Sequence, residues 1–468
     1  MAFTCMLGRM GADLAIDQFL EDSSGYRGTA NRVLQPATVA EVAEILREAN
    51  ANRVPLTIAG AGTGLTGARV PHGGVVVSLA RFQKLEIRTG SARCGAGLAL
   101  SELQNEAAKT RQFFGPNPTE NSASIGGIIS TNAGGARSFR FGAIRRHVQA
   151  LQVTFMDGRT VELKRGDRVD FPYQVVRQPQ TTKNAAGYYL QPDLEWVDLL
   201  AGSEGTLGVV TEAELALLPE PPAILSGVVF FGTEEQMLDA VDDWRNLDGL
   251  RLLESMDARG LDLLRPQYPE ISVGAHAALL IESDLASDDD IEVDRWSERL
   301  GREGCLEEES WFGMQAGDRE RFRAFRHALP AMVVDRARHG NCRKFGSDFA
   351  VPLNRNRDLY NYYRERCDAL FPNQYTIFGH IGDANVHVNL LPDTDEGAVK
   401  AEALMEDFAN YVLSLGGTVA AEHGVGKLKA NLLKLMYSEK ELDGMRNVKR
   451  QLDPHWLLGR GTIFEVPA

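Results

Sequence analysis

The sequence predicts an α+β protein of two domains, and three observations support this prediction. The chain has 468 residues, of which 44% are hydrophobic and 24% charged, as expected for two or three globular domains. Helical and strand-like patterns are mixed along its first part, where glycines crowd the turns. Glu220-Pro221-Pro222 then interrupts both patterns, because proline fits neither a helix interior nor a central strand, and a new set of elements follows.

The first part alternates between short helices and strands. Thr38 and Glu41 form a capping-box pattern that predicts a helix. The remaining elements expected here are strands at 56–58 and 75–79, a helix at 98–111, and a hairpin made by 149–155 and 160–163.

The second part restarts the pattern with longer elements. Thr233 and Gln236 cap a predicted helix. The acidic run at 283–294 is predicted to be a solvated loop. The other expected elements are strands at 225–231 and 275–282 and helices at 296–300, 319–338 and 396–415.

The charge and the cysteines exclude several classes of protein. The net charge of -14 argues against nucleic acid and anionic membranes as partners, because both need a basic face. The five cysteines are scattered without CxxC spacing, which argues against iron–sulfur and thiolate zinc sites and suits a reducing compartment. We find no secretory signal and no apolar run of membrane-spanning length, and therefore expect a cytoplasmic protein.

A glycine-rich run extends from Leu56 to Pro71. Gly62, Gly64 and Gly67 satisfy GxGxxG, but no helix can follow because Pro71 and a strand come next. This argues against a nicotinamide dinucleotide site, which needs that helix. Successive backbone N–H groups can still hold an anion in a nest, and the alternative is a mobile glycine-rich loop.

Two further glycine segments favour the binding hypothesis. They lie at 115–135 and 202–211. Three glycine loops at separate points predict one extended ligand that lies across several turns.

A cluster of metal-ligand residue types lies near the carboxyl end. His380 and His387 precede Glu422 and His423, although the whole chain has only nine histidines. Two imidazoles and a carboxylate suit a divalent metal such as zinc, with a position left open for substrate. The alternative is a pair of ordinary histidines at a sheet edge.

With these motifs the chain resembles the vanillyl-alcohol-oxidase, or p-cresol-methylhydroxylase, flavoproteins, and among them the FAD-linked D-lactate, glycolate and D-2-hydroxyglutarate dehydrogenases. The matching segments are 60–64, 125–135, 202–211, 380–387 and 422–427. The resemblance implies a two-subdomain FAD-binding domain of the p-cresol-methylhydroxylase type over 1–222. It also implies a substrate or cap domain over 223–430, with an antiparallel sheet flanked by helices, and a helical segment over 431–468 that returns to the FAD domain.

The resemblance implies FAD that is held noncovalently, since the glycine run contains no histidine before His72. The residues it assigns to FAD are Ala59, Gly60, Ala61, Gly62, Thr63, Gly64, Leu65, Pro118, Ser124, Ile125, Gly126, Gly127, Thr131, Asn132, Gly134, Gly135, Gly142, Glu204, Gly205, Gly208 and Val209.

The resemblance also assigns the late cluster. His380, His387 and Glu422 would bind a divalent metal, with Zn²⁺ expected, His423 would be the catalytic base and Asn385 a substrate contact. The metal would lower the pKa of the substrate hydroxyl, and His423 would take its proton. The Cα hydrogen would leave as hydride to the flavin, with a carbanion route as the alternative. Ala384 departs from the family, which usually has glycine there.

Two cations are candidates for the substrate carboxylate. Arg326 lies where dicarboxylate-oxidising relatives place a carboxylate-binding arginine, and Lys344 is the second candidate. The alternative for each is a surface charge. Pro330 replaces the hydroxyl that those relatives carry four residues after the arginine, and Gly459-Arg460-Gly461-Thr462 replaces their Asn-Pro-Gly-Lys.

The sequence therefore predicts FAD-dependent oxidation of a D-lactate-like 2-hydroxy acid, with D-2-hydroxyglutarate as the second substrate. A zinc hydrolase and a noncatalytic flavin-binding subunit are the rival hypotheses. The expected electron acceptor is an electron-transfer flavoprotein, a quinone or a cytochrome, and a homodimer is compatible with the sequence.

Overall fold

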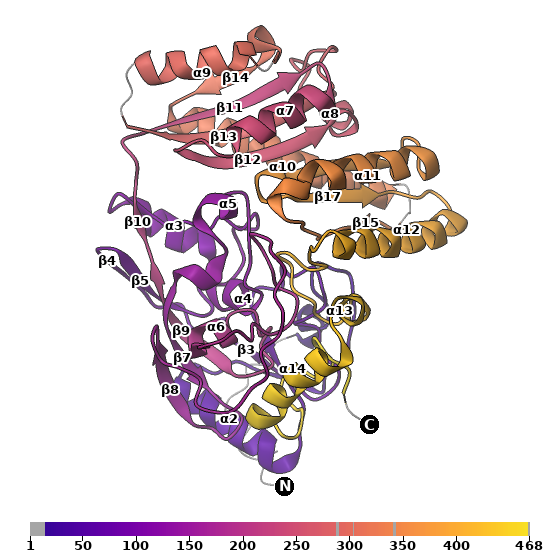
Figure 1. The fold of residues 1–468 in the computed structure, drawn as a ribbon. Coiled ribbons are helices and arrows are strands. Elements are labelled where there is room, and N and C mark those ends of the chain that lie inside the picture. Colours follow the sequence, from indigo (N-terminus) through magenta and orange to yellow (C-terminus); the bar gives the residue numbers. More distant parts are fainter. Residues whose placement is uncertain (1–14, 287–289, 303, 340–342, 467–468) are drawn as a thin grey trace.

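The protein is described here from a computed structural model, which places residues 15–286, 290–302, 304–339 and 343–466. Figure 1 shows two parts, an N-terminal half (residues 15–219) below and a cap (residues 223–415) above. The last helices, α13(Ala430–Met436) and α14(Glu439–Leu452), lie along the N-terminal half. The domain limits expected at residues 222 and 430 stay predictions.

The N-terminal half contains two sheets. A parallel sheet has the order β1(Arg32–Leu34), β3(Val75–Ser78), β2(Leu56–Ala59). An antiparallel sheet has the order β4(Leu85–Arg88), β5(Ser91–Gly95), β9(Val209–Ala216), β7(Val148–Thr154), β8(Thr160–Lys164). The remaining elements of this half are η2(Ile16–Phe19), α2(Val39–Asn52), α3(Leu100–Ala108), β6(Gln112–Phe113), α4(Ile125–Ser130), α5(Ser138–Phe141), η3(Ile144–His147), α6(Trp196–Leu200) and β10(Leu218–Pro219).

The cap is built on a seven-stranded antiparallel sheet. Its order is β14(Trp311–Gly313), β11(Ala223–Phe231), β13(Ala277–Leu285), β12(Leu250–Asp257), β16(Tyr375–His380), β17(Asn385–Leu390), β15(Phe345–Gly346). The helices of the cap are α7(Glu234–Trp244), α8(Ala258–Leu264), α9(Asp290–Arg302), η4(Glu307–Glu309), α10(Ala316–His339), η5(Leu353–Arg355), α11(Asn356–Leu370), η6(Ile381–Asp383) and α12(Asp395–Ser414).

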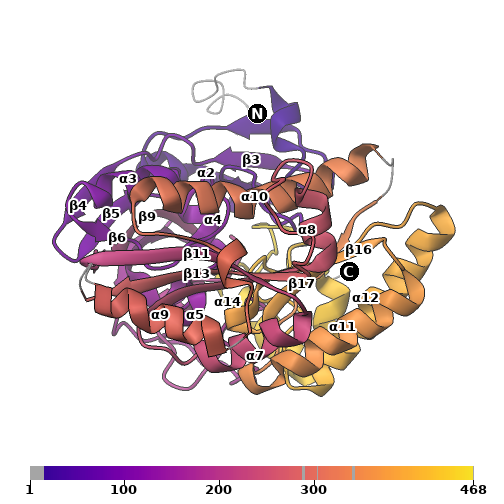
Figure 2. The same cartoon turned by 90° about the horizontal axis from the view of Figure 1, so that it is seen from above.

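Helices cover both faces of the cap sheet. Figure 2 shows α8 and α10 on one side and α7, α9 and α11 on the other. Val228 and Phe230 join the core under α10, while Val229 and Phe231 join the core under α7. This explains the apolar run Val228–Phe231 within β11, since a strand buried on both faces needs no polar alternation.

The expected fold of mixed helices and sheets, with an antiparallel sheet flanked by helices, is confirmed. The prediction for the acidic run was wrong, because β13 extends to Leu285 and α9 already begins at Asp290. Asp284 lies within the strand because Arg251 pairs with it at 2.7 Å. The sequence could not show that partner.

Two local predictions are sharpened by the structure. The Thr38 side chain accepts the Glu41 N–H at 3.2 Å as expected, but the Glu41 carboxylate returns to the N–H of Ala37 instead of Thr38. No helix lies between Gly67 and Val75, as predicted.

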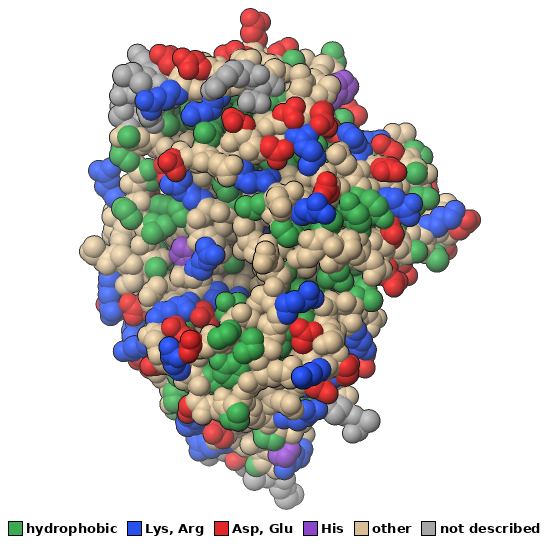
Figure 3. Space-filling view, viewed as in Figure 1, with side chains coloured by type: hydrophobic (Ala, Val, Ile, Leu, Met, Phe, Trp, Pro, Cys, Tyr) green, Lys and Arg blue, Asp and Glu red, His purple; other side chains and the backbone are tan. Residues whose placement is uncertain are grey.

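The surface and the cysteines add little to function. On the face in Figure 3 the acidic and basic side chains are interspersed. Among the residues placed above, no helix is both long and apolar enough to cross a membrane. Cys94 and Cys367 are free thiols, Cys305 Sγ donates to Leu300 O at 3.2 Å, and Cys5 and Cys342 lie outside the described residues.

Candidate active site between the glycine loops and the cap

A cavity of about 930 Å³ lies where the N-terminal half meets the cap. Its wall in the N-terminal half comes from the three glycine segments that the sequence singles out. The opposite wall comes from α10, from Lys344 and from the cluster of His380, His387, Glu422 and His423. Segments far apart in the sequence therefore share one chamber.

The glycine run at 60–65 forms one end of the cavity. Within the described chain, the backbone N–H groups of residues 62–65 have no hydrogen-bond acceptor. Gly62 has φ +86°, a conformation that favours glycine. A Cβ added to Gly64 would meet only Asp22 Oδ2, at 3.5 Å. Free N–H groups beside open space fit the pyrophosphate of a dinucleotide, as a nest does.

Most of the residues assigned to the flavin line this cavity. Those that do are Gly60, Ala61, Gly62, Thr63, Gly64, Leu65, Pro118, Ser124, Gly126, Gly127, Thr131, Gly134, Glu204, Gly205, Gly208 and Val209. The other five, Ala59, Ile125, Asn132, Gly135 and Gly142, are not in the lining.

Two of those five have structural roles. Asn132 accepts the Arg145 N–H at 2.9 Å and donates to Asn184 O at 3.2 Å. A Cβ on Gly135 would lie 1.9 Å from Asn117 O, so glycine is needed there for close backbone packing. A glycine motif in the sequence cannot separate such packing positions from ligand-facing ones.

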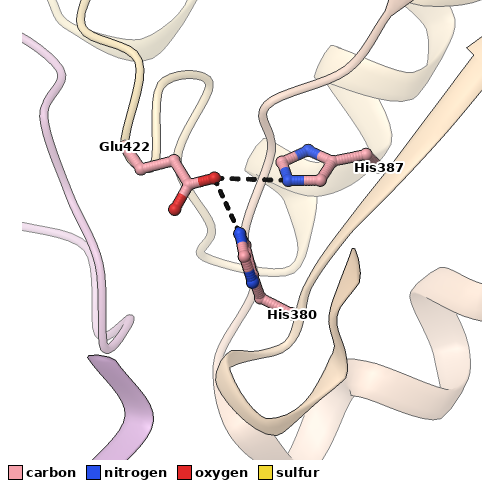
Figure 4. Close-up of side chains that lie close together, drawn as sticks. All are labelled: His380, His387 and Glu422. Carbon is pink, nitrogen blue, oxygen red and sulfur yellow. Dashed lines mark hydrogen bonds and ion pairs between the residues drawn. The ribbon is translucent and has the colours of Figure 1, made fainter. Parts of the chain in front are cut away.

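The two histidines of the predicted metal site come from adjacent strands. His380 ends β16, and His387 lies in β17, where it pairs in register with Phe378. Glu422 reaches them from the segment that follows α12, as Figure 4 shows. Its Oε1 lies 3.0 Å from His380 Nε2 and 3.3 Å from His387 Nε2.

The proton positions in this cluster fit a bound cation. His387 Nδ1 lies 2.9 Å from the carbonyl oxygen of Ser347, and His380 Nδ1 bonds the carboxylate of Glu254. Neither acceptor offers a proton when Glu254 is ionised, so each Nδ1 carries one. Each Nε2 faces Glu422 Oε1 and offers a lone pair when a cation binds between them. Three converging electron-pair donors, two nitrogens and one oxygen, suit Zn²⁺.

Glu254 was missed in the sequence, and it holds His380 in place. Burial alone would raise the pKa of its carboxyl, but Arg326 and His380 together hold the pKa well below its usual range. Its Oε2 bonds Arg326 Nε at 2.5 Å. A carboxylate behind a histidine ligand fixes the tautomer and the ring orientation.

His423 lies beside the cluster and faces the cavity. Its Nε2 is 3.6 Å from Glu422 Oε1, and its Nδ1 is 3.6 Å from Asp348 Oδ2. Burial lowers the pKa of His423 to about 4, although Asp348 and Glu422 oppose this shift. The imidazole is therefore neutral near pH 7 and can accept a proton.

Asp348, four residues after the candidate Lys344, was also missed in the sequence. It is 1% exposed and accepts the backbone N–H of Glu422 at 3.1 Å and of His423 at 3.0 Å. Lys429 Nζ bonds its Oδ2 at 2.6 Å. Asp348 thus fixes the segment that carries both the carboxylate ligand and the candidate base.

Arg326 and Lys344 both line the cavity. The two terminal nitrogens of Arg326 have no hydrogen-bond partner within the described chain, since only Nε is used on Glu254. Lys344 Nζ bonds Asn389 Oδ1 at 3.2 Å, and burial lowers its pKa. Asn385 is placed differently, because its side chain is fully buried and donates to Phe349 O at 2.8 Å.

Two departures from the family pattern have visible consequences. Pro330 lies inside α10 and lines the cavity without a hydroxyl. Ala384 has φ +52°, which explains why glycine is usual at this position, and it shows that the turn forms with a methyl group present.

Comparison with known proteins identifies similar chains over most of the length. Residues 220–463, more than half of the chain, match the family described as FAD linked oxidases, C-terminal domain. Residues 30–164 match the family described as FAD binding domain.

Several curated proteins are 28% identical to this chain. A D-lactate dehydrogenase of Archaeoglobus fulgidus covers 92% of the chain with 90% of its own length. A D-2-hydroxyglutarate dehydrogenase of Xanthomonas citri pv. viticola covers 92% with 88% of its length. The glycolate oxidase subunit GlcD of Escherichia coli K12 covers 94% with 84% of its length.

A solved structure of alkyldihydroxyacetonephosphate synthase is similar in fold. The TM-score is 0.65 at 16% identity, over 91% of this chain and 75% of that one. At this identity the likeness concerns the fold alone.

Proposed function

The chain belongs to the family of FAD-linked oxidases, and from this premise we propose that it oxidises a D-2-hydroxy acid of the D-lactate type to the 2-oxo acid. Its predicted class, an FAD-dependent oxidoreductase with an FAD-binding domain and a sheet-containing cap, is confirmed by that membership. The substrate, the metal and the roles of single residues are the proposal.

One observation carries the proposal. The free N–H groups at 62–65 and the cluster of His380, His387, Glu422 and His423 line the same cavity. An oxidation that removes a proton from a hydroxyl and two electrons from the adjacent carbon needs a base and an electron acceptor at one place.

The residues present fit both absent groups. The lining glycine segments would hold FAD, and His380, His387 and Glu422 would hold Zn²⁺. When bound, FAD supplies a two-electron acceptor and Zn²⁺ supplies a Lewis acid that acidifies a hydroxyl group.

The protein's own groups bind the acid and take its proton. Lys344 and the two terminal nitrogens of Arg326 bind the carboxylate of the substrate, since no acidic side chain among the described residues pairs with these nitrogens. Neutral His423 accepts the hydroxyl proton at Nε2, while Asp348 orients the ring from the Nδ1 side.

D-2-hydroxyglutarate is the second candidate substrate, because Arg326 and Lys344 line the same cavity and a dicarboxylate offers one carboxylate to each. Pro330 argues against it, since no hydroxyl is present at that position of the wall. The acceptor remains predicted as an electron-transfer flavoprotein, a quinone or a cytochrome. A zinc hydrolase would leave the glycine segments of this cavity without a ligand.

The purified protein provides the test. We expect a yellow protein that releases FAD on acid treatment and reduces a dye with D-lactate, less well with D-2-hydroxyglutarate, and not with L-lactate. A colourless protein would favour the hydrolase, and a yellow protein inactive with every 2-hydroxy acid would favour a noncatalytic flavin subunit.

A further inference from the structure

A lysine of the N-terminal half, Lys183, reaches the metal cluster through the protein interior. Its side chain is 0% exposed. Its Nζ lies 2.9 Å from Glu422 Oε2, 3.1 Å from Asp383 Oδ2 and 3.4 Å from Asn385 Oδ1. The contacts to Glu422 and Asn385 are hydrogen bonds, and the contact to Asp383 is an ion pair.

The backbone around Lys183 is tied to both segments that it joins. Thr182 Oγ1 donates to Asp383 O at 3.1 Å, in the turn that follows His380. The Ala185 N–H donates to Ala420 O at 2.8 Å, two residues before Glu422. The position of the Lys183 ammonium is therefore set by the backbone of 182–185 and not by side-chain freedom alone.

Gly134 makes room for this lysine. A Cβ added there would lie 2.9 Å from Cδ and Cε of Lys183 and 3.0 Å from Glu422 Oε2. The glycine segment that faces the cavity thus also packs on the ion pair. Lys183 consequently links the half that carries the glycine loops to the cluster in the cap.

We propose that Lys183 is a positioning residue that commits Glu422 to bind the metal through Oε1 alone. The proposal rests on the metal site of the proposed function. With Oε2 engaged by Lys183, only Oε1 remains directed at the two imidazoles, 3.0 and 3.3 Å away. A buried carboxylate also needs a counter-charge whenever the metal is absent, and Lys183 provides it.

The ammonium could instead weaken the site by repelling the cation. Asp383 opposes that effect, because its carboxylate lies 3.1 Å from Nζ and the two charges cancel at a distance. The orientation of Glu422 is then the larger contribution of Lys183. Removing the Lys183 ammonium weakens Zn²⁺ binding if the orientation of Glu422 dominates, and it strengthens Zn²⁺ binding if repulsion dominates. One affinity measurement therefore separates the two effects.

The test compares Zn²⁺ affinities of the full-length, flavin-containing protein by competition with a chromophoric chelator. Lys183→Met is expected to bind Zn²⁺ about 10–100-fold more weakly, the usual cost of losing a group that orients a metal ligand. Lys183→Arg keeps the cation and is expected to restore most of the affinity. Flavin content and circular dichroism are recorded for each variant.

The chain offers a matched control in a second buried lysine. Lys449 of α14 pairs with Asp453 at 2.6 Å and also bonds Thr206 O and Leu458 O, and it contacts none of the metal-binding side chains. Lys449→Met removes a buried lysine from an ion pair as well, so it is expected to lower stability and leave the Zn²⁺ affinity unchanged.

A Zn²⁺ affinity of Lys183→Met equal to or above that of the wild type would overturn the proposal, because Lys183 would then not strengthen metal binding. If this variant does not fold, Lys183→Met/Asp383→Asn removes both members of the neutral pair, and the same weakening is expected. Unchanged affinity in the double variant overturns the proposal too. If His387→Ala binds Zn²⁺ as the wild type does, the metal site itself is wrong.

Discussion

Single protons decide the chemistry of the cluster. The Nδ1 atoms of His380 and His387 bond acceptors in the protein, and both Nε2 atoms converge on Glu422 Oε1. His423 differs, because its nearest acceptors lie at 3.6 Å and it faces the cavity. We therefore propose His380 and His387 as ligand imidazoles and His423 as the imidazole that accepts a proton.

His423→Asn tests this assignment. Asparagine cannot accept the proton, so we expect the turnover number with D-lactate to fall about 10²–10⁴-fold, the usual contribution of a positioned base. FAD and Zn²⁺ contents should stay at wild-type values, since His423 is not among the proposed ligands. Dye-coupled steady-state kinetics give the rate, and a wild-type turnover number would refute the role.

The sequence could identify only part of this site. His380, His387, Glu422 and His423 are recognisable from residue type and short spacing. Glu254, Asp348 and Lys183 are not, because they act through contacts with residues far away in the chain, such as the 239-residue separation between Lys183 and Glu422. Nothing in the irregular segment around Lys183 marks it as a partner of a metal ligand.

Among the elements, the glycine run offers backbone N–H groups to a ligand without a following helix. Among the described residues its N–H groups at 62–65 have no acceptor, and no helix follows before β3 begins at Val75. From Pro71 and the strand expected at 75–79, the sequence could predict that no helix follows the glycine run. It could not tell which glycines face the cavity, because packing positions such as Gly135 satisfy the same pattern.

Gly64→Val tests whether this loop binds the flavin. A Cβ added there meets only Asp22 Oδ2, at 3.5 Å, so the flavin-free protein should keep its melting temperature. It would occupy the space in front of the free N–H groups, so we expect FAD affinity to fall at least about tenfold, the loss of about 1.4 kcal/mol. Gly317→Val, where a Cβ meets nothing within 4 Å, is the control outside the cavity. Full flavin occupancy in Gly64→Val would contradict the binding role.

Asp257, the N-cap residue of helix α8, predicts that the stability of the protein depends on pH. Asp257 accepts the Gly260 N–H and the Thr376 hydroxyl, each at 2.8 Å. Burial, reinforced by the charge of Glu234, raises the pKa of Asp257 to about 7 from a usual value of 3.8. The folded protein therefore keeps a proton there that the unfolded chain releases.

The direction of the pH dependence follows from the difference between the pKa of Asp257 in the folded protein and its usual value. The stabilising contribution is fully present below about pH 4 and is lost as the pH rises towards 7, because the unfolded chain ionises first. At about 1.4 kcal/mol per pH unit, the loss approaches about 4 kcal/mol across the window. Asp257→Asn should remove this slope in urea unfolding between pH 4 and 7. Parallel curves for the variant and the wild type would show that Asp257 does not titrate there.

At the scale of the whole molecule, the N-terminal half and the cap meet at the site. Glu204 of the N-terminal half accepts the backbone N–H groups of Val425 and Gly426, each at 2.8 Å, directly after His423. Leu458 near the carboxyl end pairs with Leu56 beside the glycine run. The mixed fold and its flanked sheet could be predicted from periodicity, but these cross-connections could not, because they depend on the packing of complete elements.

In the proposed reaction the glycine loops and the cluster of His380, His387, Glu422 and His423 act together on one substrate. The most direct measurement is anaerobic bleaching of the protein's flavin by D-lactate, in the wild type and in His387→Ala. We expect rapid bleaching in the Zn²⁺-loaded wild type, and slow bleaching after chelation and in His387→Ala, with flavin retained in all three. Equal bleaching rates in the three samples would contradict the account.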